Sequence, residues 1–132
     1  MTTGSESDAA RAGDFLSLQY VKPFVRDDGT GKSLHFTLGE LQSRMLTASP
    51  WQLEVDYTRT MMGFLLFHPA PARIGMIGLG GGSIAKFCHR YLPASRMLVL
   101  EINPNVLNPR VLEQLIPRRG TTTDNNNIKG KQ

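Results

Sequence analysis

The feature that most constrains how this chain folds is a cluster of four glycines within the five residues 78–82. Glycine loses more conformational freedom on folding than any other residue, so the cluster weakens a packed region unless close approach to the backbone is required. An apolar run, residues 72–77, leads into the cluster, and apolar side chains then recur with helical period over residues 84–92. The pattern therefore indicates that something lies close to this backbone.

The segment around the glycines predicts one βαβ unit, in which a strand, a tight turn, a helix and a second strand follow one another. Residues 72–77 have the character of a fully buried parallel strand that ends in the turn. Ser83 is the predicted N-cap of the helix that follows. A second apolar run, residues 96–104, contains the carboxylate of Glu101. These elements are the start of a Rossmann-like parallel sheet.

Two further patterns precede this unit. In residues 15–52, short β-favouring runs alternate with turn residues, and Leu34, Phe36 and Leu38 alternate ahead of a turn, which predicts a small β-hairpin region. In residues 53–68 apolar side chains recur every three to four positions, which predicts a helix with a core-facing stripe. The stripe consists of Leu53, Tyr57, Met61, Phe64 and Leu65.

The expected fold class is α/β, with the small β-hairpin region followed by an incomplete Rossmann-like parallel sheet of the kind found in S-adenosylmethionine-dependent methyltransferases. We predict a flexible leader over residues 1–14, a β-rich region over 15–52 and a partial nucleoside-binding domain over 53–106. Residues 107–132 are predicted to form a basic, disordered tail, with room for a helical turn or two at residues 110–116.

Composition argues against several classes of protein. No apolar stretch in the 132 residues reaches the 18 that a membrane helix needs, and the N-terminus lacks the pattern of a secretory signal. The single cysteine, Cys88, agrees with a reducing cytoplasmic location. The net charge of +4 arises mostly from residues 109–132, without interleaved aromatic residues. We therefore expect neither a nucleic-acid nor a membrane partner.

The glycine turn and Glu101 together predict a nucleoside site. A strand that ends in such a turn lets a ligand lie against the backbone and presents N–H groups at the positive end of a helix. An acidic residue about 20 positions onward, at the tip of the next strand, can accept hydrogen bonds from both ribose hydroxyls. The spacing of Gly78, Gly80 and Gly82 is typical of sites for S-adenosyl ligands. A dinucleotide site, or glycines that serve only helix-on-strand packing, are the alternatives.

Residues from about Leu34 to Val106 resemble the spermidine synthase (polyamine aminopropyltransferase) family, most closely its bacterial spermidine synthase-like members. The resemblance depends on four stretches in the family's order and spacing, namely "GELQSRM", "DYTRTMMGFLLFHP", "RIGMIGLGGGSIAKF" and "VLEINPNV". It implies a protein that binds decarboxylated S-adenosylmethionine, or S-adenosylmethionine, and passes an aminopropyl group to a polyamine such as putrescine. A homodimer is a further expectation.

The resemblance also implies roles for individual residues. Gln42 would contact the nucleoside and Tyr57 the substrate. Glu101 would hold the ribose. The aminopropyl arm and thioether would lie in a cradle formed by Gly78, Gly80, Gly81 and Gly82.

This chain departs from the family pattern at several positions. Gly81 stands where the family commonly has an aspartate, and Thr58 where it commonly has a histidine, so two polar groups that hold amines are lost. The acidic residues after Glu101 are Glu113 and Asp124, in segments unlike those that carry the family's catalytic aspartate. A general base must lie within hydrogen-bond reach of its proton. We therefore expect a truncated chain without a catalytic residue, inactive in the transfer.

Other readings remain open. An S-adenosylmethionine-dependent methyltransferase is one alternative, although such enzymes usually have an acidic residue at the place of Met76. A non-catalytic nucleoside-binding fragment is the other. His35 and His68 are isolated, so no metal site is expected. Cys88 falls on the apolar side of its helix and is expected to be a buried core residue.

Overall fold

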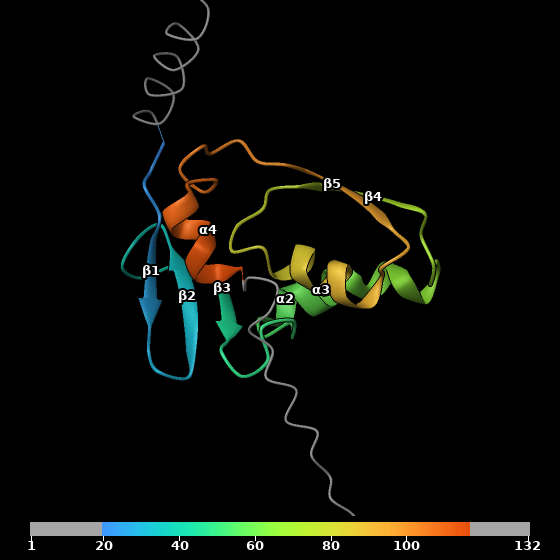
Figure 1. The fold of residues 1–132 in the computed structure, drawn as a ribbon, viewed down its shortest axis with the longest axis horizontal. Helices are drawn as coiled ribbons and strands as arrows, with labels where there is room; N and C mark the ends of the chain where they lie inside the picture. The colour runs from blue at the N-terminus through green and yellow to red at the C-terminus, as the bar shows by residue number, and fades with distance from the viewer. Residues whose placement is uncertain (1–19, 117–132) are drawn as a thin grey trace, which may run out of the picture.

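The computed structural model describes residues 20–116, which form two small sheets and the helices around them (Figure 1). An antiparallel sheet in the order β1-β2-β3 comes first, and a parallel pair, β4 and β5, follows. The α/β fold class is therefore confirmed. The elements in chain order are β1 (Phe24–Asp27), β2 (Gly31–His35), β3 (Leu41–Leu46), α2 (Asp56–Met61), the 3₁₀ helix η1 (Met62–Leu66), β4 (Arg73–Ile77), α3 (Ser83–Tyr91), β5 (Arg96–Leu100) and α4 (Pro109–Leu115).

The antiparallel sheet contains the predicted hairpin and one additional strand, β1. Leu34 in β2 is fully buried, whereas Leu38 in the β2–β3 turn is 80% exposed. The alternation of apolar residues therefore predicts burial correctly inside the strand and not in the turn that follows it. The predicted leader, residues 1–14, lies outside the described residues, and the division into four ranges stays a prediction.

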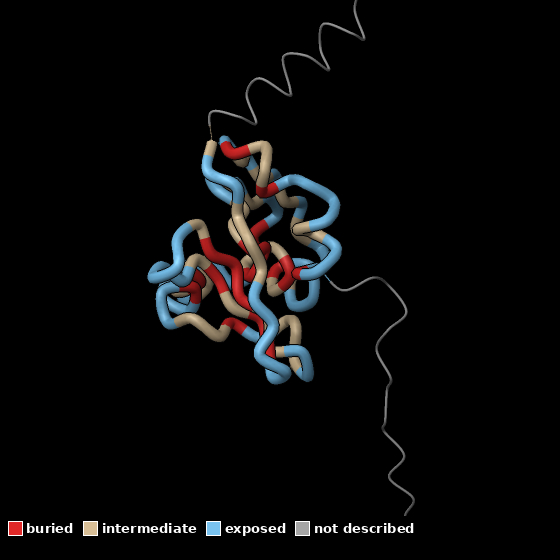
Figure 2. Tube along the Cα trace, turned by 90° about the vertical axis from the view of Figure 1, so that its left-hand side faces the viewer, coloured by how far each residue is buried: buried red, intermediate tan, exposed pale blue. Residues whose placement is uncertain are grey.

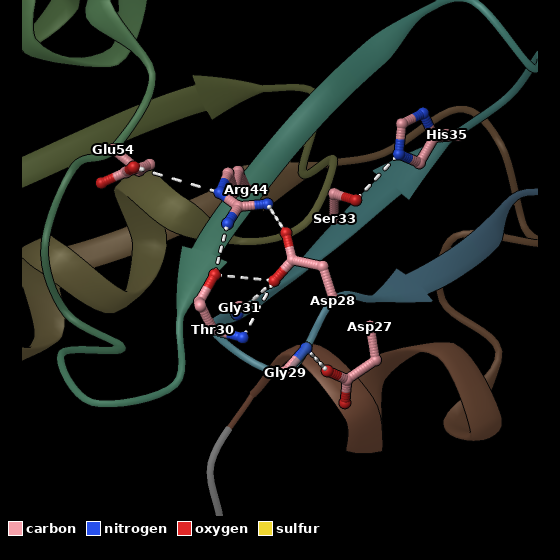
Figure 3. A network of polar contacts seen from close by, with 9 residues as sticks. All are labelled: Asp27, Asp28, Gly29, Thr30, Gly31, Ser33, His35, Arg44 and Glu54. Atoms are coloured by element: carbon pink, nitrogen blue, oxygen red, sulfur yellow. Dashed lines mark hydrogen bonds and ion pairs between the residues drawn. The ribbon is translucent and has the colours of Figure 1, made fainter.

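A polar network joins the turn between β1 and β2 to β3 (Figure 3). One carboxylate oxygen of Asp28 accepts hydrogen bonds from the backbone N–H groups of Thr30 and Gly31, each 2.9 Å long. The other accepts a 2.7 Å hydrogen bond from Arg44 on β3. The guanidinium of Arg44, followed by the Thr30 hydroxyl, holds the pKa of Asp28 well below its usual range. The network therefore holds the β1–β2 turn against β3.

The predicted helix over residues 53–68 is shorter than expected, and most of its stripe is not in the core. It consists of α2 and η1, and the side chains of Tyr57 and Met61 are 49% and 52% exposed. The buried positions are instead Thr58 and Met62. The core-facing prediction is therefore wrong for Tyr57 and Met61, because this side of α2 faces a cavity beside the glycine turn.

The predicted βαβ unit is confirmed. Strands β4 and β5 pair in parallel from Arg73 opposite Arg96 to Ile77 opposite Leu100, and α3 connects them. Cys88 on α3 is 3% exposed and forms a core with Leu53 and Met62, as the sequence predicts for this cysteine. Partly buried side chains complete this core: Leu65, Ile74, Ile84, Phe87, Leu92 and Met97.

One face of the parallel pair is not covered, so the expectation of fully buried strands is wrong. Burial alternates along both strands, and Ile77 and Leu98 are 90% and 65% exposed. The helices pack on the opposite face, through Ile74 and Met97. Figure 2 shows buried segments gathered toward the middle of the fold, with exposed segments mostly around them. Among the described residues, none covers the outer face of this sheet.

The start of α3 also differs from the prediction. The N-cap is Gly82, in a left-handed conformation with a φ of 73°, and no side chain caps the helix. Ser83 is the first helical residue rather than the cap. The turn out of β4 is so tight that its last residue needs a positive φ, which glycine adopts without strain.

Helix α4 lies within the range that we expected to be a disordered tail. Pro109 occupies its first turn, and the Asn108 side chain caps it by accepting a 3.0 Å hydrogen bond from the backbone N–H of Arg110. The helix packs beside β1 and β2, and Leu115 near its end is 1% exposed (Figure 1). Order therefore extends through residue 116, and the rest of the tail, residues 117–132, lies outside the described residues.

The two halves of the fold meet where the glycine turn contacts β3. A Cβ atom added to Gly81 would overlap the hydroxyl of Ser43 and lie 3.0 Å from its Cβ. The side chain of Leu115 lies 3.6 Å from the same point. Gly81 is therefore required by close packing between the two halves.

We expect Gly81→Ala to lower the free energy of unfolding by about 1–3 kcal/mol, the usual cost of overpacking. Ser43→Ala removes the overlapping hydroxyl and should return part of that loss, which a double-mutant cycle in urea measures. Additive effects of the two substitutions would show that Gly81 does not pack against Ser43 in solution.

Candidate glycine-turn site

Three of the four glycines in the cluster have left-handed backbone conformations. The φ angles are 85° at Gly78, 54° at Gly80 and 73° at Gly82. A Cβ atom added to Gly78 or Gly80 would meet nothing within 4 Å. Gly78 and Gly80 are therefore required for their backbone conformation, and they border open space. Gly81 is required because it packs closely against β3.

The carboxylate of Glu101 is held against this turn. One oxygen accepts a 2.7 Å hydrogen bond from the backbone N–H of Leu79, within the glycine cluster, and the other accepts a 2.8 Å hydrogen bond from the N–H of Asn103. The strand pairing continues up to this point, because the N–H of Gly78 donates to the carbonyl of Leu100 over 2.6 Å. The βαβ register therefore brings an acid at the end of β5 onto the turn at the end of β4.

A cavity of about 210 Å³ lies beside the turn. Its walls come from β3, α2, the end of β4 and the first turn of α3. The lining residues are Gln42, Ser43, Tyr57, Thr58, Met61, Met76, Ile77, Gly78, Leu79, Gly80, Gly81, Ser83 and Ile84. None of these side chains is charged.

Hydrogen bonds already occupy two hydroxyls of the lining. The Tyr57 hydroxyl donates to the backbone carbonyl of Gln42 over 2.9 Å and so links α2 to β3. The hydroxyl of Thr58, which is 1% exposed, donates to the carbonyl of Val55 over 2.5 Å. These contacts hold the α2 wall of the cavity in place.

The structure brings together five of the seven residues that the sequence nominates for the site. Gln42, Tyr57, Gly78, Gly80 and Gly81 all line the cavity. The other two, Gly82 and Glu101, do not line it, although Glu101 is bound to Leu79, which does. Whether any of them contacts a ligand stays a prediction.

Sequence reasoning did not nominate the other lining residues for the site, among them Ser43, Met61 and Ile84. Met61 lies one helical turn after Tyr57, so the same periodicity that predicts a core stripe places it on the cavity wall. Ser43 follows Gln42 directly and has no feature of its own that indicates the contact with Gly81.

The remaining candidates are accounted for by local packing. Burial raises the pKa of the Cys88 thiol. The ring of His35 contacts the carbonyl of Glu40 through Nδ1 and the hydroxyl of Ser33 through Nε2, at 2.9 and 2.8 Å. Within residues 20–116, no group of three His, Cys, Asp or Glu side chains is placed to hold a metal ion. No helix in the same range is long and apolar enough to cross a membrane, and a cytoplasmic location stays a prediction.

Lys86 is a buried cation on the helix that begins at the turn. The residue is 4% exposed, and its ammonium donates a 2.8 Å hydrogen bond to the carbonyl of Leu115 near the end of α4. Burial lowers the pKa of Lys86 from 10.5 to about 8, because desolvation disfavours the charged form. The contact joins α3 to α4 beneath the glycine turn.

Comparison with known proteins finds several polyamine aminopropyltransferases. The polyamine aminopropyltransferase of Chromobacterium violaceum is 42% identical over 83 residues, which is 63% of this chain and 32% of that protein. The polyamine aminopropyltransferase of Neisseria meningitidis is 43% identical over 84 residues, with the same shares of the two chains. The resemblance to the spermidine synthase family is confirmed. This chain spans about a third of the length of these relatives.

A relative with a different name also matches. The eEF1A lysine and N-terminal methyltransferase of Xenopus laevis is 40% identical over 60 residues, which is 40% of this chain and 9% of that protein. No family model matches the chain, and no solved structure matches it. The matches to both kinds of transferase agree with a partial Rossmann-like fold.

The burial of Lys86 predicts a dependence of stability on pH. The folded state binds fewer protons than the unfolded state between the folded pKa, about 8, and the ordinary value of 10.5. The free energy of unfolding should therefore rise with pH across this window, by up to about 3 kcal/mol. Lys86→Met should abolish that rise, which urea titrations at a series of pH values measure.

Lys22→Met, at an exposed lysine, is the matched control and should follow the unmodified chain at every pH. Parallel curves for Lys86→Met and the unmodified chain would contradict the buried position of Lys86.

Proposed function

We propose that this chain binds an adenosine nucleoside with a sulfur-containing 5′ arm, the ligand class of the aminopropyltransferases, and does not itself transfer the aminopropyl group. The observation that carries the proposal is the position of Glu101. Its carboxylate rests on the glycine turn through the N–H of Leu79, next to a cavity whose walls include Gln42 and Tyr57.

Glu101 retains the capacity to bind a ribose. An ionised carboxylate has about four acceptor positions, and the N–H groups of Leu79 and Asn103 occupy two of them. The remaining positions are available to the 2′ and 3′ hydroxyls of a sugar. The sulfur arm would then lie along Gly78 and Gly80, where the absence of side chains leaves open space.

The lining of the cavity supports the proposed absence of transfer. An attacking amine must lose a proton, and a general base has to lie within hydrogen-bond reach of it. No aspartate, glutamate or histidine side chain is among the described residues that line the cavity. Decarboxylated S-adenosylmethionine as co-substrate, a polyamine acceptor such as putrescine and a homodimer remain predictions from the resemblance.

Methyl transfer from S-adenosylmethionine is the second candidate function, and the similarity to the Xenopus laevis methyltransferase favours it. Against it, Met76 lines the cavity two residues before the first glycine of the turn, at the place where such methyltransferases usually have an acidic residue. This candidate predicts tighter binding of S-adenosylmethionine than of methylthioadenosine.

The test is a ligand titration of the full 132-residue chain. Methylthioadenosine should raise the melting temperature in a concentration-dependent way, because a ligand that binds only the folded state stabilises it. NAD should raise it less. Glu101→Gln should weaken methylthioadenosine binding by about 10- to 100-fold, the loss expected for hydrogen bonds to a charged group (about 1.5–3 kcal/mol).

Two controls separate binding from folding. Glu40→Gln makes the same change at an exposed carboxylate in the β2–β3 turn and should bind normally. Gly80→Ala should abolish binding. Gly29→Ala is its control, because Gly29 has a φ of 84° in a turn that does not line the cavity. This substitution introduces the same backbone strain, roughly 1–2 kcal/mol, and should leave binding intact. A response to NAD alone, or to none of the ligands, would refute the proposed nucleoside class.

A separate assay tests the absence of transfer. The chain, incubated with decarboxylated S-adenosylmethionine and putrescine, should release no methylthioadenosine above the rate without protein, because the described cavity lacks a base to deprotonate the amine. The Chromobacterium violaceum relative serves as the positive control. Release that depends on this chain and is lost in Glu101→Gln would show that it is an active transferase.

A further inference from the structure

We infer that the cavity selects a nucleoside whose 5′ arm is an uncharged thioether over one whose arm is cationic, and that a charged side chain at position 61 changes this preference. The inference rests on the proposed function, since it concerns the arm of the nucleoside bound there. Methylthioadenosine has the uncharged arm. Decarboxylated S-adenosylmethionine has a sulfonium and a primary ammonium in the same place.

The lining of the cavity contains no negatively charged side chain to pair with a cation. Its apolar part includes the thioethers of Met61 and Met76 and the aliphatic Ile84. Its polar side chains are neutral amides and hydroxyls, and two of those hydroxyls already donate to backbone carbonyls. A cation that enters such a cavity loses part of its hydration and gains no opposite charge in return.

The backbone around the cavity adds to the same preference. Helix α3 begins at Ser83, which lines the cavity, and it is nine residues long. The unpaired N–H groups of a helix N-terminus carry partial positive charge, which disfavours a sulfonium or an ammonium nearby. Glu101 lies outside the lining, and in the proposed site its carboxylate binds the ribose rather than the 5′ arm.

Met61 is the lining position at which charge can be changed with least effect on the fold. It is the last residue of α2 and is 52% exposed, so a polar side chain there remains in contact with water. In contrast, Thr58 on the same wall is 1% exposed, and Ile84 packs on the Cys88 core. A carboxylate at position 61 would add a negative charge to the cavity that Gly78 and Gly80 also line.

The experiment compares the dissociation constants of methylthioadenosine and decarboxylated S-adenosylmethionine for the full chain by isothermal titration calorimetry. The unmodified chain should bind methylthioadenosine at least about tenfold more tightly. Met61→Glu should reduce this ratio by about fivefold relative to the matched control Met61→Gln. Met61→Lys should increase it. The melting temperature of each variant without ligand confirms that it folds.

Each outcome bears on a separate claim. Equal or tighter binding of the cationic ligand by the unmodified chain would overturn the inference and leave the nucleoside site intact, and this comparison requires no variant. The same ratio in Met61→Glu and Met61→Gln would show that a charge at position 61 does not act on the arm of the ligand. Binding of neither nucleoside would overturn the proposed function, and this inference with it.

Discussion

The close approach of Gly81 to Ser43 fixes the glycine turn against the antiparallel sheet, and the candidate site depends on that contact. The side chain of Leu115 at the end of α4 lies beside the same glycine. The contact with Ser43 brings β3, which carries Gln42, to the same cavity as α2 and the end of β4. Glu101 restrains the turn from its other side through the N–H of Leu79. A site built from segments so far apart in sequence therefore depends on one glycine and one carboxylate.

Sequence patterns predict the parts of this fold that depend on local periodicity and spacing. The βαβ unit, the burial of Cys88 and the position of Glu101 at the turn follow from apolar period and from the length of a strand–helix–strand connection. Tyr57 and Met61 have the same helical period as a core stripe and yet line a cavity, because periodicity identifies a common face and not what that face meets. The role of Gly81 is likewise set by tertiary packing.

The parallel pair shows a second limit of such patterns. Strands β4 and β5 have apolar residues on both faces, as in a sheet covered by helices on both sides, and sequence alone predicts burial on both. In the described residues the helices cover only one face, so Ile77, Leu98 and Leu100 are exposed. Burial therefore depends on which elements lie nearby, whereas strand formation depends on the residues themselves.

The two backbone contacts of Glu101 suit a binding site better than a structural ion pair would. Its two backbone hydrogen bonds orient the carboxylate and use half of its acceptor capacity, so a ribose would add contacts without breaking existing ones. Binding then avoids much of the cost of ordering a flexible acid. An arginine or lysine partner would instead compete with the sugar for the same oxygens. Backbone donors thus preorganise the acid, and they do so only because the glycine turn places the N–H of Leu79 within 2.7 Å of it.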